Sequence, residues 1–263
     1  MAIIANHTKR QLARGKLALG MGVRQARTVD IAAIAKTAGF DWLFIDCEHG
    51  SMGTDTAAQI AAASLAVGIT PIVRVPGLEH WHASRLLDNG AQGIVVPHVD
   101  TAAEAKRVAD TCRYAPLGKR SMGGGLQQLG FEPVPVGEAA RIVNEETLVV
   151  VMIESPQGLE NCEAIAAVPG IDALLIGTND LCLELGIAGE FDDPRVAEAY
   201  RKVIAACRKH GKFPGMGGMY TPELLERHVG MGVQLILSGS DYSLLMQAAT
   251  ARAKLVRGFE GKR

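Results

Sequence analysis

Short runs of apolar residues alternate along the chain with longer, alanine-rich runs. The run Val149–Ile153 is apolar at every position, which is typical of a parallel strand that is covered on both faces. Eight runs of this kind predict strands at Leu17–Val23, Trp42–Asp46, Thr70–Val75, Gly93–Pro97, Leu148–Glu154, Ala173–Gly177, Lys212–Met216 and Gln234–Ser238.

The runs between these strands have the spacing of helices. Several end at a glycine just before the next strand, as at Gly39 and Gly211. We expect helices near Thr28–Ala38, Asp55–Val67, Trp81–Asn89, Thr101–Thr111, Gly137–Glu145, Gly158–Ala167, Pro194–His210, Pro222–Val229 and Ser240–Arg257. Eight strand–helix units predict an α/β protein that folds as a (β/α)8 TIM barrel, with residues 1–263 as one domain.

An open, doubly wound sheet is the main alternative. Such a sheet with a dinucleotide site carries Gly-x-Gly-x-x-Gly after its first strand, and no such motif follows Val23. The glycine cluster at 123–125 lies instead in the long irregular segment Tyr114–Pro135. A loop of that length is usually functional or mobile. The barrel is therefore the favoured fold.

Composition narrows the possible partners and the cellular compartment. Lys and Arg number 27 and Asp and Glu 28, so the formal net charge is −1 and a basic nucleic-acid surface is not expected. The five cysteines include no Cys-x-x-Cys pair, which argues against a disulfide framework or a structural zinc site. No apolar run reaches the roughly 18 residues of a membrane span or has the character of a signal peptide. These features predict a cytoplasmic protein without nucleic-acid or membrane partners.

The carboxyl ends of the strands in a (β/α)8 barrel all face one mouth. Four strand ends carry ionisable side chains: Asp46 and His49 after the second strand, Arg74 on the third, Glu154 on the fifth and Asp180 after the sixth. The sequence therefore predicts one pocket that contains a histidine, an arginine and several carboxylates.

Glu154 and Asp180 lie on adjacent strands in this arrangement. Two carboxylates without a nearby histidine suit a hard divalent ion such as Mg²⁺ or Mn²⁺, with positions left for water and a chelating substrate. The alternative is that both are helix-capping or backbone-binding carboxylates. The segment Gly177–Asp180 also begins a helix, whose free N–H groups could bind a substrate carboxylate or form an ordinary N-terminus without a ligand.

Arg74 and His49 each have two interpretations. Arg74 follows an apolar strand and needs an anionic partner, which is either a reacting oxyanion or a salt-bridging Glu48 or Asp46. His49 is suited to act as a general base near neutral pH, or it is a capping or salt-bridged surface residue. No lysine is predicted at a strand end inside the barrel, so Schiff-base chemistry is not expected.

Several segments, in order over nearly the whole chain, resemble those of the HpcH/HpaI aldolases: Ile45–Gly50, Val73–Val75, Leu86–Gly90, Arg113–Arg120, Ile153–Glu154 and Gly177–Leu181. The resemblance implies a class II pyruvate aldolase, a lyase that reversibly cleaves a 4-hydroxy-2-oxo acid to pyruvate and an aldehyde in aromatic or sugar acid catabolism. Alternatives are a related enolate-forming lyase (an oxaloacetate decarboxylase, or one of citrate-lyase or macrophomate-synthase type) and a non-catalytic barrel that binds a small acid.

The resemblance also implies roles for individual residues. Glu154 and Asp180 would hold Mg²⁺, Mn²⁺ or Co²⁺, Arg74 would stabilise the oxyanion, and His49 would move the proton. In the family an aspartate in the segment that matches Leu86–Asp88 raises the basicity of the histidine. Asp88 is predicted at a helix end away from the mouth, so it would act across a subunit contact; Asp46 is the local alternative.

The expected substrate-binding residues include two departures from the family pattern. Met152 stands where many relatives have glutamine, and Thr178 and Asn179 stand in a segment that reads Gly-Pro-Ala/Ser-Asp in relatives. Both departures concern the substrate rather than the metal chemistry. Arg113, Lys119 and Arg120 are expected to give the mouth a modest basic surface. The predicted substrate-binding residues are Arg74, Met152, Gly177, Thr178, Asn179, Asp180 and Arg120.

The resemblance implies a homohexamer with a swapped C-terminal helix. The last predicted helix has an apolar stripe formed by Leu244, Ala248, Ala251 and Leu255. This stripe fits docking on a neighbouring subunit, and packing on its own barrel is the alternative.

Overall fold

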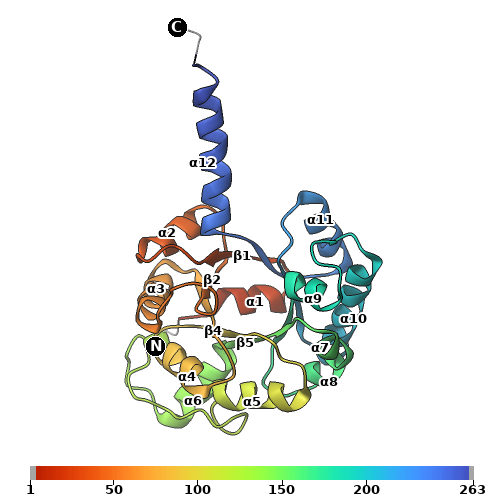
Figure 1. The fold of residues 1–263 in the computed structure, drawn as a ribbon. Helices are drawn as coiled ribbons and strands as arrows, with labels where there is room; N and C mark the ends of the chain where they lie inside the picture. The colour runs from red at the N-terminus through yellow and green to blue at the C-terminus, as the bar shows by residue number, and fades with distance from the viewer. Residues whose placement is uncertain (1–3, 261–263) are drawn as a thin grey trace.

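The computed structural model describes residues 4–260 and forms the predicted closed barrel of eight parallel strands (Figure 1). Each strand pairs with the next, and the first closes on the last. Every strand boundary lies within two residues of its prediction: β1 (Ala18–Val23), β2 (Trp42–Asp46), β3 (Thr70–Arg74), β4 (Gly93–Val96), β5 (Leu148–Ile153), β6 (Ala173–Gly177), β7 (Phe213–Gly217) and β8 (Leu235–Ser240). Residues 1–3 and 261–263 of the expected domain lie outside the described residues.

Most predicted helices are present: α2 (Asp30–Thr37), α3 (Thr54–Val67), α4 (His80–Asp88), α5 (Ala102–Cys112), α6 (Val136–Glu146), α10 (Pro194–His210), α11 (Pro222–Met231) and α12 (Asp241–Arg257). The single helix predicted at Gly158–Ala167 is wrong. Two short helices, α7 (Pro156–Glu160) and α8 (Cys162–Ala166), meet at Asn161, where the side chain donates to the Asp100 carbonyl (2.8 Å). A short helix α9 (Thr178–Glu184) begins where the sequence indicated, and a 3-10 turn, η1 (Gln127–Leu129), lies in the long loop.

Helix α1 (His7–Ala13), which the sequence patterns did not predict, closes the amino end of the barrel. The Thr8 N–H donates to the Thr70 hydroxyl (3.2 Å), and the Asn6 amide donates to the Gln92 carbonyl (3.0 Å). Leu12 is buried among residues of the barrel interior. The amino end is thereby filled, which leaves the carboxyl end as the accessible mouth.

The continuous apolar strands are explained by burial on both faces. On β5, Leu148, Val150 and Met152 belong to the cluster inside the barrel, whereas Val149 and Val151 pack in the layer between strands and helices. This alternation follows from the two-residue period of a strand.

Trp42 fills the barrel interior, where it is fully buried and its indole N–H donates to the Ala18 carbonyl (3.1 Å). A Cβ at Gly20 would lie 2.2 Å from the Trp42 ring, so the close approach of this ring to β1 requires glycine.

Arg113 is buried, and the prediction that it contributes to a basic surface at the mouth is wrong. Its guanidinium donates to the carbonyls of Gly170 (2.9 Å) and Thr147 (3.0 Å) and forms an ion pair with Asp172. It therefore ties the segment after α5 to the starts of two strands.

Substitution of Arg113 by methionine should lower the free energy of unfolding by about 3–5 kcal/mol, because it removes the buried ion pair with Asp172 and leaves the Gly170 and Asn144 carbonyls without their side-chain donor. Urea denaturation measures this loss. Arg141→Met is the matched control, since Arg141 is 61% exposed and, among residues 4–260, pairs only with Glu145 on its own helix. A change below about 0.5 kcal/mol is expected there. Equal losses in the two variants would contradict a structural role for Arg113.

Helix α12 leaves the barrel and projects away from it (Figure 1). It touches β1 and β8 near its first turn, and none of its residues is buried. Leu245 is 67% exposed and Leu255 55% exposed, so within one chain the helix does not bury its apolar side chains. Across residues 4–260, no helix is both long and apolar enough to cross a lipid bilayer.

Candidate active site

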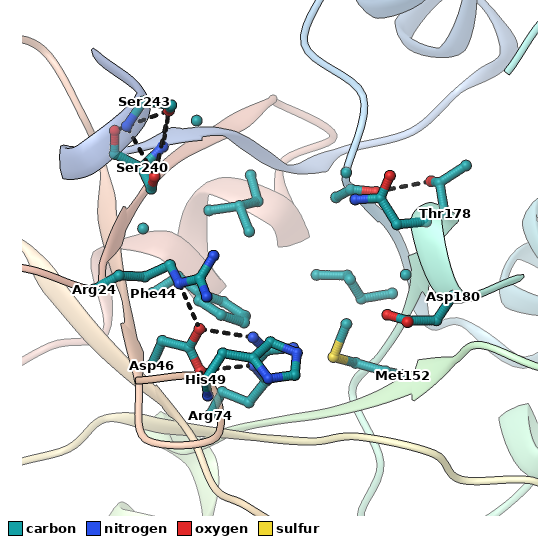
Figure 2. Close-up of a pocket in the computed structure, with 18 of the residues that line it drawn as sticks. Arg24, Phe44, Asp46, His49, Arg74, Met152, Thr178, Asp180, Ser240 and Ser243 are labelled. Atoms are coloured by element: carbon teal, nitrogen blue, oxygen red, sulfur yellow. Dashed lines mark hydrogen bonds and ion pairs between the residues drawn. The ribbon is translucent and has the colours of Figure 1, made fainter. Parts of the chain in front are cut away.

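A cavity of about 400 Å³ opens at the carboxyl ends of the barrel strands (Figure 2). Its walls come from residues at or just after seven of the strands, β4 being the exception. All the predicted site residues line it except Asp88 and Arg120. The reasoning from strand ends therefore located this pocket, because parallel strands in a barrel deliver their carboxyl ends to one place.

Glu154 and Asp180 face this cavity from adjacent strand ends. The Glu154 side chain is 1% exposed, and its Oε2 accepts the backbone N–H of His98 (2.9 Å). Burial raises the pKa of Glu154, the His98 N–H opposes that rise, and the negative charge of Asp180 adds to it. Two negatively charged side chains therefore line the same cavity.

Gly177 makes room for this arrangement. The register between β5 and β6 places Ile153 beside Ile176, so the next residues, Glu154 and Gly177, are neighbours as well. A Cβ on Gly177 would lie 2.3 Å from Glu154 Oε1. A larger residue would therefore displace the carboxylate, which the sequence alone could not indicate.

The donor set of this pair fits a divalent cation. Asp180 lies in the first turn of α9, and its carboxylate makes no hydrogen bond or ion pair to any described residue, so the structure does not support a capping role for it. Within residues 4–260, no three His, Cys, Asp or Glu side chains gather as a metal cluster. Mg²⁺ is commonly bound by two carboxylates, and water and substrate oxygens complete its coordination shell.

Arg74 forms both of the salt bridges that the sequence offered as alternatives. Asp46 and Arg74 are register partners on β2 and β3, and Arg74 Nε and Nη2 donate to the two Asp46 oxygens at 3.0 and 2.7 Å. Arg74 Nη1 lies 2.8 Å from Glu48 Oε2, and the guanidinium carbon lies 5.0 Å from the centre of the Phe44 ring. The guanidinium is therefore rigidly held at the wall of the pocket.

Asp46 holds Arg74 and a loop rather than the imidazole of His49. Its Oδ1 accepts the backbone N–H groups of Glu48 (3.1 Å) and His49 (3.2 Å). Burial by itself raises the pKa of Asp46, but the hydrogen bonds and charge of Arg74 outweigh burial and lower it. The His49 ring is 51% exposed, and its Nε2 lies 3.9 Å from Glu48 Oε2. The ring is thus accessible to a ligand or water in the pocket.

Asp88 and Arg120 lie away from this cavity and pair with each other, with Arg120 Nη2 2.5 Å from Asp88 Oδ1. Asp88 is the last residue of α4, as predicted, and its side chain is 36% exposed. Arg120 is buried over the Tyr114 ring and borders a different groove of about 920 Å³. Within one chain neither residue reaches His49 or the carboxylate pair.

The two departures from the family pattern lie at the pocket. Met152 is 5% exposed and points into the cavity near Asp180 (Figure 2). The Thr178 hydroxyl donates to the Gly217 carbonyl (2.7 Å) and lies 2.8 Å from the Tyr200 hydroxyl, so it is engaged within the protein. Asn179 is exposed at the rim.

The cavity is also lined by side chains that were not among the predicted site residues, including those of Arg24, Tyr220 and Tyr242. Arg24 directly follows β1, so the strand-end argument used for the other strands would have found it. Tyr220 lies after β7 and Tyr242 in the first turn of α12; neither carried a distinctive sequence signal.

Comparison with known proteins identifies the chain's relatives. Residues 24–248 match the profile described as HpcH/HpaI aldolase/citrate lyase. The chain is 38% identical to a 4-hydroxy-4-methyl-2-oxoglutarate aldolase of Hapsidospora irregularis, with 99% of this chain and 98% of the relative covered. It is 35% identical to a hydroxypyruvate/pyruvate aldolase of Delftia acidovorans, with 95% and 92% covered. A crystal structure of an HpcH/HpaI aldolase from Desulfitobacterium hafniense superposes with a TM-score of 0.91 at 30% identity, covering 96% and 97% of the two chains.

Proposed function

The chain belongs to the HpcH/HpaI aldolase/citrate lyase family, and from this premise we propose that it reversibly cleaves a 4-hydroxy-2-oxo acid to pyruvate and an aldehyde. Its aldolase relatives align over nearly the whole chain, so the protein is a carbon–carbon lyase. The observation that carries the finer proposal is one pocket lined by two carboxylates on adjacent strands, Glu154 and Asp180, and by the anchored guanidinium of Arg74.

We assign Glu154 and Asp180 to a divalent cation, Mg²⁺ or Mn²⁺, with Co²⁺ as a further candidate. Such a cation would relieve the repulsion between the two carboxylates and, when bound, would polarise the carbonyl of a 2-oxo acid and neutralise negative charge that develops on it. Met152 and the start of α9 would form the wall against which the 2-oxo acid lies.

Arg74 is suited to stabilise the oxygen of the pyruvate enolate. A guanidinium has five N–H donors, and two of them donate to Asp46. Arg74 Nη1 forms an ion pair with Glu48 without a hydrogen bond, so donors remain for a substrate oxygen. Because Asp46, Glu48 and Phe44 fix the group beforehand, little reorganisation is needed as charge develops.

His49 is suited to move the proton. In the cleavage direction the C3–C4 bond breaks, its electron pair stays on C3, and the proton of the C4 hydroxyl passes to the imidazole directly or through water. The exposed ring can then exchange that proton with solvent. The enolate gains a proton at C3 to give the methyl group of pyruvate.

Deuterium exchange into the methyl group of pyruvate, followed by proton NMR in heavy water, tests this function without assuming an aldehyde. We expect exchange with Mg²⁺ or Mn²⁺ that EDTA abolishes and that His49→Ala lacks. Absence of exchange with every metal, both with and without added aldehyde, would reject the pyruvate aldolase. Oxaloacetate decarboxylation would then distinguish a related lyase from a non-catalytic barrel.

We also propose that the exposed helix α12 docks on a second copy of the chain. Its apolar side chains Leu245 and Leu255 are unburied in one chain, and the family resemblance implies a homohexamer. In such an assembly Asp88, with Arg120 beside it, would support His49 of a neighbouring copy.

Light scattering after size-exclusion chromatography should give a native mass of several times 27.8 kDa. The double substitution of Leu245 and Leu255 by glutamate should shift the protein to smaller species, because it places charge in an apolar contact. Gln247→Glu, a charge change at an exposed polar position of the same helix, is the control. A monomeric native mass would contradict the docking of α12.

A further inference from the structure

Arg24 is a cation at the mouth of the pocket without a strong partner. It follows β1, lines the cavity, and its side chain is 45% exposed. Its nearest acid is Asp46, with Nε 3.5 Å from Oδ2. Arg74 Nη2 donates to the same Asp46 oxygen at 2.7 Å, so the contact of Arg24 is the longer and weaker of the two. The terminal nitrogens of Arg24 make no hydrogen bond to any residue that the structure describes.

The backbone of Arg24 is held in place, whereas its guanidinium makes only the weak contact with Asp46 among the described residues. Asp241, the first residue of α12, accepts the N–H groups of Arg24 (3.0 Å), Gln25 (2.9 Å) and Ala26 (2.7 Å). Arg27 donates to the Arg24 carbonyl (2.9 Å). The loop after β1 is therefore fixed, and Arg24 extends from it into the pocket (Figure 2).

The charges of the pocket leave Arg24 as the remaining cation. Arg74 is paired with Asp46 and Glu48, and a divalent cation would balance Glu154 and Asp180. Arg24 lies on the wall opposite Asp180 (Figure 2), since β1 and β6 are separated by two strands in one direction and four in the other. A ligand that spans the pocket would meet the carboxylate pair at one end and, at the other, a guanidinium whose terminal nitrogens make no hydrogen bond to a described residue.

We propose that Arg24 selects substrates with a second carboxylate, at the end away from the 2-oxo acid group. Resting on the function proposed above, this inference identifies the cleaved compound as a 4-hydroxy-2-oxo dicarboxylate and the released carbonyl compound as one that itself carries a carboxylate. A planar guanidinium suits such an anion because it can donate two parallel hydrogen bonds to it. Asp241 is a positioning residue for Arg24 because it fixes the loop that carries it.

Equilibrium binding of two matched ligands tests the proposal. 2-Oxoglutarate and 2-oxopentanoate have the same chain length, and only the first has a distal carboxylate; neither has the hydroxyl that cleavage requires. Isothermal titration calorimetry with Mg²⁺ present should show that the full-length protein binds 2-oxoglutarate about 10- to 100-fold more tightly. Arg24→Met should abolish that preference, whereas Arg24→Lys should retain part of it. Asp241→Asn should weaken the preference, because the loop is then less firmly fixed.

Arg14→Met is the matched control, since it removes the same charge from an exposed position just after α1, at the opposite end of the barrel. It should leave the preference unchanged. Three results would overturn the role of Arg24. The unaltered protein could bind both ligands with equal affinity, it could fail to bind 2-oxoglutarate, or Arg24→Met could lose affinity for both ligands equally. Pyruvate exchange separates the two proposals: exchange without a ligand preference rejects Arg24 alone, whereas absence of exchange rejects the aldolase.

Discussion

Replacing Asp180 by asparagine should reduce metal-dependent deuterium exchange of pyruvate by about 10³-fold or more. Lewis-acid stabilisation by a bound cation contributes several kcal/mol, and each 1.36 kcal/mol is a factor of ten in rate. Only two carboxylates face the proposed cation among residues 4–260, so loss of one charge removes half of the protein's anionic ligands. The substitution keeps the shape of the side chain.

A second measurement separates loss of the cation from loss of folding. Mn²⁺ should raise the melting temperature of the unaltered protein, because a ligand that binds only the folded state stabilises it, and Asp180→Asn should lose most of this increase. In the absence of metal its melting temperature should not fall, since the substitution relieves repulsion with Glu154. Glu184→Gln, the same change at an exposed position of the same helix, should behave as the unaltered protein. Normal exchange in Asp180→Asn would remove this residue from the metal site.

Arg74→Met should lower the exchange rate by about 10²- to 10³-fold, as loss of an oxyanion donor does. It should also cost about 3–5 kcal/mol of stability, because it removes both side-chain hydrogen bonds to the 1%-exposed Asp46 carboxylate. Arg74→Lys keeps the charge but not the two parallel hydrogen bonds, so we expect it to restore only part of the rate. A rate near that of the unaltered protein in Arg74→Met would make the arginine purely structural.

The double substitution of Arg74 by methionine and Asp46 by asparagine distinguishes these two effects. It removes the buried unpaired charge, so stability should largely return while the exchange rate stays low. Recovery of both would show that the single variant lost activity through unfolding.

The Asp46–Arg74 pair should also make stability depend on pH. Because the folded pKa of Asp46 is lowered, the pair contributes stability above the unfolded value of about 3.9. That contribution disappears as pH falls through the lower, folded value. The gap in unfolding free energy between the unaltered protein and Arg74→Met should therefore narrow in acid, and urea denaturation at several pH values measures it.

The barrel could be predicted because its signals are local. Strand length, continuous apolar runs and glycines at helix ends depend on neighbours a few residues away, and parallel strands in a barrel bring their carboxyl ends together wherever each strand begins. That rule placed Glu154, Asp180, Arg74 and His49 in one pocket before any contact was known. The local patterns did not predict α1, because this helix fills the amino end of the barrel through contacts with residues far away in the sequence.

The partners within the site were decided only by the tertiary structure. Arg74 lies 28 residues from Asp46, and their pairing depends on the register of β2 against β3. The need for glycine at 177 arises from a glutamate on another strand, and the contact of Arg24 with Asp46 is weak because Arg74 binds the same carboxylate more closely. By itself the sequence determined which elements form and which strand ends meet. Which charge is paired and which remains free depended on distances between residues far apart in the chain, and a local pattern contains no information about those distances.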